Sequence, residues 1–404
     1  MRQIEVRYKY RLRVTLAQAY QLKDVFDSCR FVWNRALGDW TDAWKNEQRS
    51  VQYGEADRAL TLRRKEFDWL RGQPSIPEQQ VVRDLYKSIV AFFDKKNPAG
   101  RPTFKKKGTH HSARWTKNGF AVKDGRLHVA VGGSRTALRV VWSRELASVP
   151  ASVTVYKDRC GHYWASFVCR IEVPEERINA TGRATGLDVG LTRFATVEDA
   201  EHDVQNPRYL RHAQKALARS QHNMSRKKKG SKNRARAKTR LARQHAKVAS
   251  QRLDFQHKAA HGLVANYDQI GVEDLRVKNM MARSKRGGHR RAKSGLSRAI
   301  GDAGWSQFVR VLEHQATKTG VEVVKIPAAY SSQRCSQCGS ITKTRLKLSD
   351  RVFRCSDCGL EIDRDRNAAR NLNPARVRQN PAGLLSGQGV DGMKTRVPAR
   401  TLAA

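Results

Sequence analysis

Hydrophobic and polar positions change their spacing several times along the chain. The opening residues EVRYKYRLRV alternate and predict a strand. Helical spacing follows in LAQAYQLKDVFDSCRFVWNRALGDWTDAWK, which has a tryptophan-rich apolar face, and again in PEQQVVRDLYKSIVAFFDKK. Aromatic residues at this spacing are more typical of a core than of a base-stacking surface. We therefore expect a compact all-helical unit over about residues 11–100.

Short alternating runs replace the helical pattern from RPTFKKKG to about residue 178. They are RLHVAV, LRVVWS, ASVTVYKD and HYWASFVCRIEV. Runs of this length and alternation predict an antiparallel β-barrel or sandwich. The first strand is a candidate for the same sheet, in which case the helices form an insertion.

The second half of the chain alternates strands and helices. GLDVGLTRFATVED contains two apolar runs around a turn at Gly190, and a long helical region follows that is interrupted at Gly230. The later predicted elements are the strand QIGVEDL, a basic loop at SKRGGHRRAKSG, the helix GWSQFVRVLEHQATKTG, the strand VEVVKIP and a helix starting at DRDRNAARNL. Residues 375–404 lack periodicity and are expected to be disordered.

The charge of the chain narrows the class of partner. Lysine and arginine total 79 against 37 acidic residues, which gives a formal net charge of +42. Such self-repulsion favours binding to a polyanion, and nucleic acid is the commonest one in a cytoplasm. No run reaches the roughly 18 apolar residues of a membrane span, and the charged start does not resemble a signal peptide. We therefore expect a cytoplasmic nucleic-acid-binding protein without a membrane partner.

Four of the seven cysteines form one cluster with metal-ligand spacing. They are Cys335, Cys338, Cys355 and Cys358. Two Cys-x-x-Cys pairs predict a zinc site with four thiolate ligands, and since no position would remain open to water, the zinc is expected to be structural. A redox dithiol is the alternative, which the presence of two matched pairs disfavours. The remaining cysteines are expected to be buried small hydrophobes; they are Cys29, Cys160 and Cys169.

Carboxylates at the ends of apolar runs indicate a second kind of metal site. Asp188 lies in ATGLDVGL and Glu273 ends QIGVE, although acidic residues are depleted in strands and costly to bury. A third carboxylate is expected at the start of the last helix, where the candidates are Glu361, Asp363 and Asp365. The order of these elements is that of a ribonuclease H-like domain, in which three carboxylates bind two Mg²⁺ ions about 4 Å apart.

These motifs resemble TnpB, the RNA-guided nuclease family of bacterial insertion sequences, which is related to type V CRISPR effectors. The resemblance extends to about residue 374. It is carried by GLDVGLTRFAT, IGVEDL, CSDCG with DRDRNAARNL, SRKKKGSKNRARAKTRLARQHAKVASQRLDFQHKAA, YSSQRCSQCGS, YKYRLRVTLAQ, CRFVWNRAL and RPTFKKKG.

The resemblance implies a multidomain α+β protein. Residues 1–10 and 101–180 would form a wedge β-barrel, with a helical recognition domain over 11–100. Residues 181–328 and 361–374 would form a RuvC nuclease domain, with a zinc-ribbon insert over 329–360 that binds target nucleic acid. A disordered tail would span 375–404. The loop from Lys285 to Lys293 is a candidate lid, with Gly287 and Gly288 as its flexible points.

The resemblance also implies the site residues and partners. Asp188, Glu273 and Asp365 would be catalytic and would bind two Mg²⁺, because the family motif places its ligand two residues before Asn367. Asp363 is then expected to be a helix N-cap. The implied partners are a guide RNA and double-stranded target DNA, with no protein partner required. Candidate nucleic-acid contacts are Lys227, Lys228, Lys229, Lys232, Arg234, Arg236, Arg240, Gln79, Gln80 and Arg83.

The expected activity is RNA-guided cleavage of double-stranded DNA beside a short motif, by a transposon-associated enzyme of the bacterial cytoplasm. The alternatives are a miniature type V CRISPR effector, a guide-directed repressor that does not cleave DNA, and a DNA-strand-transfer transposase. A repressor is expected to have lost one of the three carboxylates, and all three are present.

Overall fold

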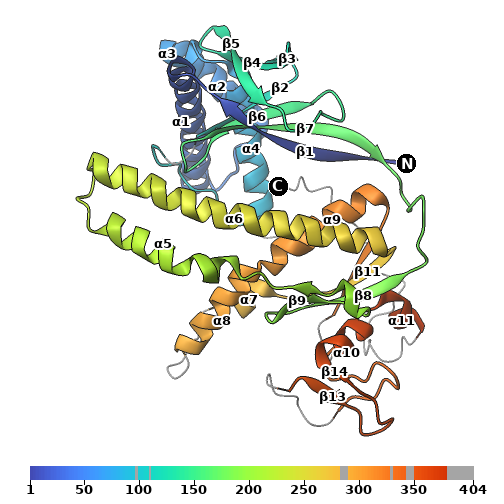
Figure 1. The fold of residues 1–404 in the computed structure, drawn as a ribbon. Helices are drawn as coiled ribbons and strands as arrows, with labels where there is room; N and C mark the ends of the chain where they lie inside the picture. The colour runs from blue at the N-terminus through green and yellow to red at the C-terminus, as the bar shows by residue number, and fades with distance from the viewer. Residues whose placement is uncertain (96–98, 109–110, 283–289, 328–330, 343–349, 380–404) are drawn as a thin grey trace. The chain divides into compact units, whose positions relative to one another are not determined.

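A computed structural model describes residues 1–404 except 96–98, 109–110, 283–289, 328–330, 343–349 and 380–404. The chain divides into two compact units, one comprising Gln3–Ile171 and one that begins at Glu172 (Figure 1). No helix among the described residues is long and apolar enough to cross a membrane.

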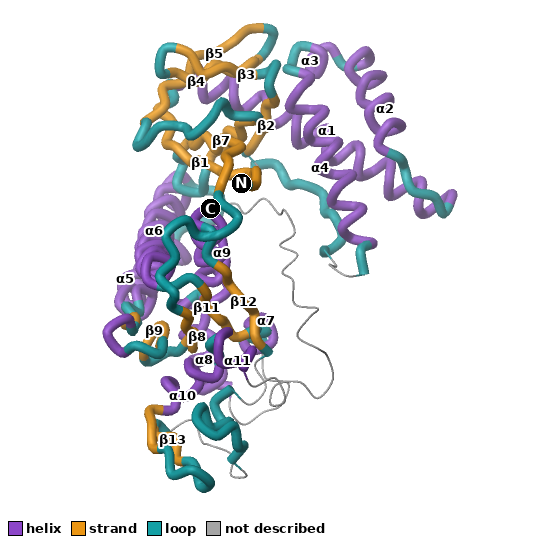
Figure 2. Tube along the Cα trace, turned by 90° about the vertical axis from the view of Figure 1, so that its right-hand side faces the viewer, coloured by secondary structure: helices purple, strands orange, loops and turns teal. Residues whose placement is uncertain are grey.

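The first unit contains a seven-stranded sheet with the order β2-β6-β7-β1-β5-β4-β3. Its strands are β1 (Arg2–Arg13), β2 (Ser112–Thr116), β3 (Phe120–Lys123), β4 (Arg126–Val131), β5 (Ser134–Val141), β6 (Ser152–Lys157) and β7 (Tyr163–Val173). The two edge strands, β2 and β3, are separated by only three residues, so the sheet must curl until its edges approach each other (Figure 2). The prediction of a barrel-like sheet that includes the first strand is confirmed in this nearly closed form.

Four helices lie between β1 and β2 along the chain. They are α1 (Leu16–Glu47), α2 (Tyr53–Glu66), α3 (Asp68–Arg71) and α4 (Ser75–Phe93). The strand ends at Arg13, close to the end of the predicted run EVRYKYRLRV and past the predicted domain boundary at residue 10. The helix α1 then begins after a capping box made by Thr15 and Gln18. Leu22, Val25 and Phe26 of α1 pack with the inner face of the sheet, as expected for core residues.

The second unit is built on a mixed five-stranded sheet with the order β10-β9-β8-β11-β12. Its strands are β8 (Ala184–Val189), β9 (Arg193–Thr196), β10 (Val204–Gln205), β11 (Gln269–Glu273) and β12 (Glu322–Ile326). The strands β8, β11 and β12 are parallel, whereas β9 and β10 continue the sheet in antiparallel fashion.

Two helices cover one face of this sheet. Leu187, Ile270 and Val272 point to that face and pack with residues of α6 (Lys232–Asn266) and α9 (Trp305–Thr319). Because side chains alternate along a strand, the residues next to them face the opposite side. That side is covered by α10 (Arg364–Asn371). The other helical elements of the unit are η1 (Ala200–His202), α5 (Tyr209–Ser225), α7 (Val277–Met280), α8 (Arg290–Ala303) and α11 (Pro374–Gln379).

Two of the predicted irregular segments contain helices. Residues 285–289 of the candidate lid, including Gly287 and Gly288, lie outside the described residues, but α8 begins at Arg290, inside the predicted loop. The prediction that residues 375–404 are disordered is wrong for the first of them, which belong to α11. Asn373 accepts a hydrogen bond from the backbone N–H of Ala375, and Pro374 occupies the first position of α11. A cap followed by proline favours helix initiation, which short-range periodicity does not reveal.

Candidate functional site

The strands β8 and β11 bring Asp188 and Glu273 to the same edge of the sheet. Their parallel register pairs Leu187 with Val272, so the next residue along each strand is a carboxylate. Carboxyl ends of parallel strands meet at one edge, which is where ligands bind in open sheets of this kind. The sequence therefore places two acidic side chains side by side on neighbouring strands.

Each of these carboxylates is preceded by a glycine two positions earlier. Gly186 and Asp188 face one side of β8, and Gly271 and Glu273 face the same side of β11. A Cβ at Gly186 would overlap the carbonyl oxygen of Ala369, and one at Gly271 would overlap the carbonyl oxygen of Leu372. The backbone at the end of α10 thus lies directly on the two glycines, on the face that carries the acids.

The first turn of α10 supplies the third carboxylate. Asp365 is largely buried and lies 3.3 Å from the guanidinium of Arg364. Asp363 instead accepts hydrogen bonds from the backbone N–H groups of Asp365 and Arg366, both at 3.0 Å, and pairs with Arg193 at 2.5 Å. The prediction that Asp363 is the N-cap is confirmed. Glu361 lies in β14 (Glu361–Asp363), is exposed and pairs with Arg354.

The electrostatics of Asp188 reflect its burial and its acidic neighbours. Burial, with the negative charges of Asp365 and Glu273, raises the pKa of Asp188 to about 7. Burial also raises the pKa of Glu273, which is partly offset by a hydrogen bond donated by Ser331 at 3.1 Å. The charges of Asp365 and Glu273 both act on Asp188, so the three carboxylates form one acidic neighbourhood, although their oxygens do not all lie within 4.8 Å of one another. Such a site stabilises a bound cation, and its oxygen donors fit a hard ion such as Mg²⁺.

The four cysteines form a second group. Their sulfur atoms lie within 4.8 Å of one another, with Cys335 3.6 Å from Cys358 and Cys338 3.5 Å from Cys355. In both pairs the glycine after the second cysteine has a positive φ and donates its backbone N–H to the carbonyl of the first cysteine. The two matched turns present four sulfurs to one point, so the predicted metal-binding cluster is confirmed as a group that can hold a metal ion.

Asn367 connects the cysteine cluster to α10. This fully buried side chain accepts a hydrogen bond from the backbone N–H of Ser336 at 2.9 Å and donates one to the carbonyl of Arg334 at 2.7 Å. Asn371, one turn later, donates to the carbonyls of Ser331 and Arg334. The first cysteine turn is therefore bonded to the helix that carries Asp365.

A further group of potential ligands lies in the turn between β6 and β7. Asp158, Cys160 and His162 have ligand atoms within 4.8 Å of one another. The oxygens of Asp158 already accept hydrogen bonds from the backbone of Cys160 and His162 and from the indole of Trp164. These bonds account for the cluster as a capped turn. Cys29 and Cys169 are buried, as expected.

The predicted nucleic-acid contacts are divided between surface and interior. Lys228, Lys229, Lys232, Arg236 and Arg240 are exposed around the turn between α5 and α6, where Gly230 separates the two helices, and Lys227 is half-buried there. Arg234 donates to the backbone carbonyls of Met224, Ser225 and Lys227, which closes the turn.

On α4, Gln79 and Arg83 are exposed, but Gln80 is buried and accepts a hydrogen bond from Arg114. The prediction that Gln80 contacts DNA is therefore wrong. Glutamine spacing alone did not indicate which face of the helix packs on β2.

Three residues that position α10 and the cysteine turn were not predicted from the sequence. Gly186 and Gly271 seat α10, and Asn367 anchors the cysteine turn. The repeated pattern of glycine, apolar residue and acid in GLD and GVE was a usable signal, because glycine is unfavourable inside a strand unless another backbone approaches closely. Asn367 offered no comparable signal, since its partners lie in a separate segment of the chain.

Comparison with family models gives three matches. Residues 166–284 match a model described as "Probable transposase", and residues 305–372 match "Cas12f1-like, TNB domain". Residues 1–49 match "Helix-turn-helix domain". In this chain those residues form β1 and one unbroken helix, α1, so the description does not correspond to their structure here.

Solved structures share the fold at low sequence identity. One described as "Cryo-EM structure of the Cas12f1-sgRNA-target DNA complex" has a TM-score of 0.59 at 13% identity, covering 89% of this chain and 83% of that one. "Structure of the mini-RNA-guided endonuclease CRISPR-Cas_phi3" has a TM-score of 0.55 at 9% identity, covering 93% and 92%.

Relatives in sequence establish the family. A "Putative RNA-guided DNA endonuclease" of Streptomyces pristinaespiralis is 36% identical over 388 residues, covering 95% of this chain and 92% of the relative. "Putative RNA-guided DNA endonuclease InsQ" of Escherichia coli K12 is 33% identical over 374 residues, covering 90% of each. "TnpB-like protein L79" of Acanthamoeba polyphaga mimivirus is 26% identical over 242 residues, covering 57% of this chain and 44% of the relative. The chain therefore belongs to the TnpB-like family of RNA-guided DNA endonucleases.

Proposed function

We propose that this protein is a transposon-associated, RNA-guided endonuclease that cuts double-stranded DNA beside a short motif. The observation that carries the proposal is that Asp188 and Glu273 end adjacent parallel strands, while Asp365 of α10 is near enough to disfavour ionisation of Asp188. All three acids are retained, which favours cleavage over a guide-directed repressor. Family membership supports the choice of an RNA-guided nuclease.

Asp188, Glu273 and Asp365 would hold two Mg²⁺ ions in a RuvC-type site. When bound, the ions would activate a water for attack on a phosphodiester and stabilise the departing oxygen. The residues of the chain hold this site in place. Gly186 and Gly271 let α10 approach the sheet, Ser331 orients Glu273, and Asp188 is only partly exposed to solvent.

Cys335, Cys338, Cys355 and Cys358 would bind one structural Zn²⁺. Four sulfur donors in two matched turns suit this soft, tetrahedral ion and leave no site for catalytic water. Asn367 would transmit the rigidity of the zinc ribbon to the helix that carries Asp365.

The first unit would serve as wedge and recognition domains, and the partners would be a guide RNA and double-stranded DNA. The surplus of positive charge supports binding to phosphates, while base pairing with the guide would supply sequence specificity. Gln79 and Arg83 remain candidates for contacts with the DNA motif. The cytoplasmic location and the domain boundaries stay predictions.

Changing the guide tests this proposal. RNA that co-purifies with the protein would be sequenced, its guide segment replaced, and the complex incubated with Mg²⁺ and two DNA duplexes, one matching each guide. We expect cleavage to move to the duplex that matches the new guide. Cleavage that ignores the guide would contradict RNA guidance. Binding to the matched duplex without cleavage would identify a repressor, and transfer of a DNA strand to a new site would identify a transposase.

A further inference from the structure

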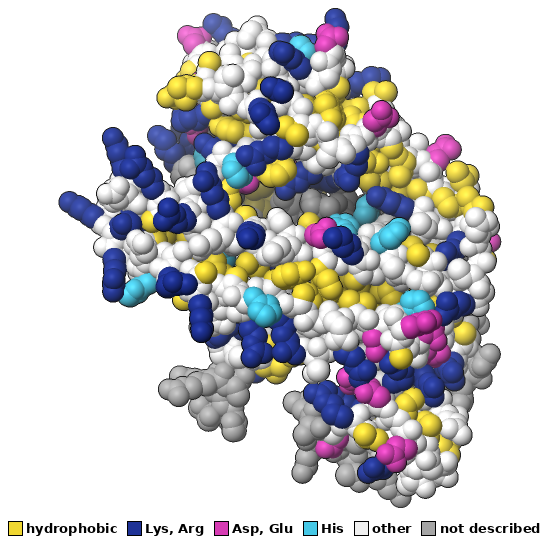
Figure 3. Space-filling view, viewed as in Figure 1, with side chains coloured by type: hydrophobic (Ala, Val, Ile, Leu, Met, Phe, Trp, Pro, Cys, Tyr) yellow, Lys and Arg dark blue, Asp and Glu magenta, His cyan; other side chains and the backbone are white. Residues whose placement is uncertain are grey.

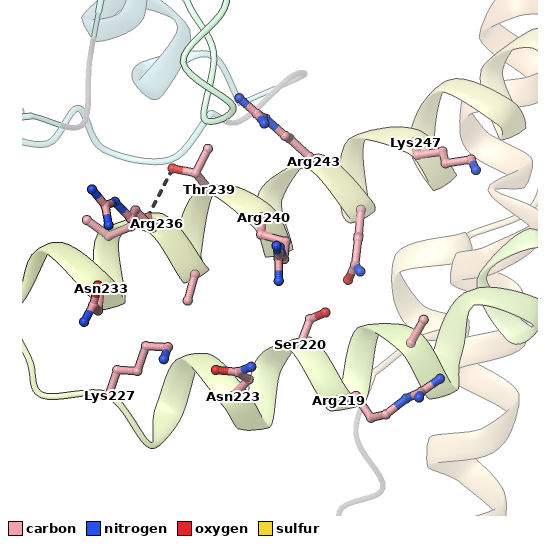
Figure 4. Close-up of a pocket in the computed structure, with 14 residues that line it drawn as sticks. Arg219, Ser220, Asn223, Lys227, Asn233, Arg236, Thr239, Arg240, Arg243 and Lys247 are labelled. Carbon is pink, nitrogen blue, oxygen red and sulfur yellow. Dashed lines mark hydrogen bonds between the residues drawn. The ribbon is translucent and has the colours of Figure 1, made fainter.

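The helices α5 and α6 form an antiparallel hairpin, and lysine and arginine side chains gather over it on the face shown in Figure 3. A groove of about 1160 Å³ runs between the two helices, and its fourteen lining residues, all of them described, include no carboxylate. Figure 4 shows Arg240 pointing from α6 toward α5, and Ser220 of α5 pointing back toward α6. The hairpin is joined to the acidic site at the point where α5 begins.

Two residues just before α5 hold the turn that follows Asp188. The side-chain amide of Asn206 donates a hydrogen bond to the backbone carbonyl of Leu191 at 2.9 Å, and the guanidinium of Arg208 donates to the same oxygen at 3.3 Å. The side-chain oxygen of Asn206 also accepts the backbone N–H of Arg208 at 3.1 Å. We call these two residues the clasp, because both converge on one carbonyl three residues after Asp188.

The backbone of Arg208 has a conformation that is unusual for its position. This residue is the N-cap of α5, with φ 48° and ψ 44° in the left-handed region, whereas an N-cap is ordinarily extended. Apart from glycines, the described part of the chain has two other residues with positive φ, Gln48 at the C-cap of α1 and Asp124 in the turn between β3 and β4. Helix ends and hairpin turns commonly adopt this conformation. A helix start does not require it, so the strain at Arg208 indicates a constraint beyond helix initiation.

The turn that the clasp holds connects two parts of the acidic site. It is tight, because a Cβ on Gly190 would lie 2.8 Å from the carbonyl oxygen of Arg193. Asp188 precedes the turn, and the side chain of Arg193 extends from it to Asp363, the N-cap of α10, at 2.5 Å. A shift of the turn would therefore move Asp188 and, through Arg193, the helix that carries Asp365.

The start of α5 is also anchored independently of this turn. The carboxylate of Asp302, near the end of α8, accepts the backbone N–H of Leu210 at 2.9 Å and that of Arg211 at 3.2 Å. These N–H groups lie in the first turn of α5, where a helix offers them no carbonyl of its own. Farther along, α5 and α6 share a small apolar core that includes Leu217 and Leu241. The clasp thus ties the turn to a braced hairpin.

We propose that Asn206 and Arg208 are positioning residues of the nuclease site, which fix the turn after Asp188 to the α5–α6 hairpin and so hold the metal-binding carboxylates in place. The inference rests on the proposed function, because it takes Asp188 and Asp365 to be magnesium ligands. It adds that two residues outside the ligand set control how tightly the metal binds. An anchor that only stabilises the fold would explain the hydrogen bonds as well, but it would not change metal affinity at unchanged stability.

Binding of Mn²⁺ to the full-length, zinc-loaded protein without RNA or DNA tests the clasp, with Asp188→Asn identifying the signal of the acidic site. Arg208→Gly removes the guanidinium but relieves the strain at positive φ, so its Tm should stay close to that of wild type. We expect this variant to weaken Mn²⁺ binding about 10-fold. Arg208→Lys retains a donor and should recover part of the affinity.

Asn206→Asp separates the two contacts of the side chain. It keeps the oxygen that accepts from Arg208 but places a second oxygen, in place of the amide donor, against the carbonyl of Leu191. We expect Mn²⁺ affinity to fall about 10-fold here too. In guided cleavage both clasp variants should lower kcat by about 10-fold or more, with little change in the DNA concentration that gives half the maximal rate.

Arg211→Ala is the matched control, because it removes an exposed charge of α5 that does not line the groove and keeps the backbone N–H that Asp302 accepts. It should leave Mn²⁺ affinity and kcat unchanged. The proposal is overturned if Arg208→Gly and Asn206→Asp bind Mn²⁺ as wild type does, or if Arg211→Ala weakens binding as much as they do. Unchanged Mn²⁺ affinity of the clasp variants, in a protein that makes guided cuts, would refute only this inference. Weakened affinity in a protein without guided cleavage would refute only the proposed activity.

Discussion

The ionisation of Asp188 changes strongly on folding, because burial and two neighbouring carboxylates raise its pKa from 3.8 to about 7. The folded protein therefore retains a proton that the unfolded chain releases. Without added magnesium, the free energy of unfolding should fall by up to about 4 kcal/mol as pH rises from about 4 to about 7. Above about pH 7 the contribution of Asp188 should stay constant.

Asp188→Asn removes this cost of ionisation. We predict that, with zinc retained and magnesium absent, the variant has a higher Tm than wild type at pH 8 and a similar Tm near pH 4. Thermal unfolding at the two pH values measures this directly. Equal Tm values at pH 8 would mean that Asp188 is not held in the acidic site that the structure describes.

Asp365 and Asp363 are two residues apart, but alanine substitutions at the two positions are expected to have different effects on cleavage and stability. Asp365→Ala removes a proposed magnesium ligand and should lower cleavage at least about 10³-fold without a large change in Tm. Asp363→Ala removes the N-cap of α10 and the pair with Arg193, which should lower stability by about 1 kcal/mol while cleavage persists at a reduced rate. Reversed effects on cleavage would assign the ligand to Asp363.

At the scale of the element, the seating of α10 on the sheet determines where Asp365 lies. In Gly271→Ala the new methyl group would overlap the carbonyl of Leu372, so the end of the helix must move. We predict a loss of about 1–3 kcal/mol in stability together with a loss of cleavage.

Gly262→Ala is the matched control, because a Cβ at this exposed position of α6 meets nothing within 4 Å. It should raise stability by about 0.5–1 kcal/mol and leave cleavage unchanged. Thermal unfolding and cleavage rates of the two variants measure both effects. Wild-type behaviour of Gly271→Ala would show that α10 does not need this close approach.

Local sequence predicted most elements because their signals lie within short segments. The alternation in β1, the turn at Gly230 and the two cysteine pairs each need only a few neighbouring residues. The position of α10 was not predictable in the same way, since it depends on Gly186 and Gly271 meeting a backbone about a hundred or more residues away. Burial of Gln80 likewise depends on packing against β2, which a helical pattern alone does not specify.

At the scale of the whole molecule, hydrogen bonds of Asn367 connect the cysteine cluster to the helix that carries Asp365, a residue of the proposed magnesium site. Cys335→Ser should abolish stoichiometric zinc, loosen the ribbon and, through Asn367, reduce cleavage at least about 10-fold. Metal analysis and cleavage rates measure both effects. RNA binding should persist, because the exposed lysines and arginines of α5 and α6 lie outside the zinc ribbon. Full cleavage by the zinc-free variant would show that the ribbon does not support the acidic site.

The most direct test of the central claim is cleavage of guide-matched DNA by the complete complex of protein and co-purified RNA in Mg²⁺. We predict that the wild-type complex cuts both strands, and that Asp188→Ala binds the same RNA with unchanged affinity but cuts neither strand. Equal cleavage by wild type and Asp188→Ala would contradict the assignment of this site as the nuclease centre.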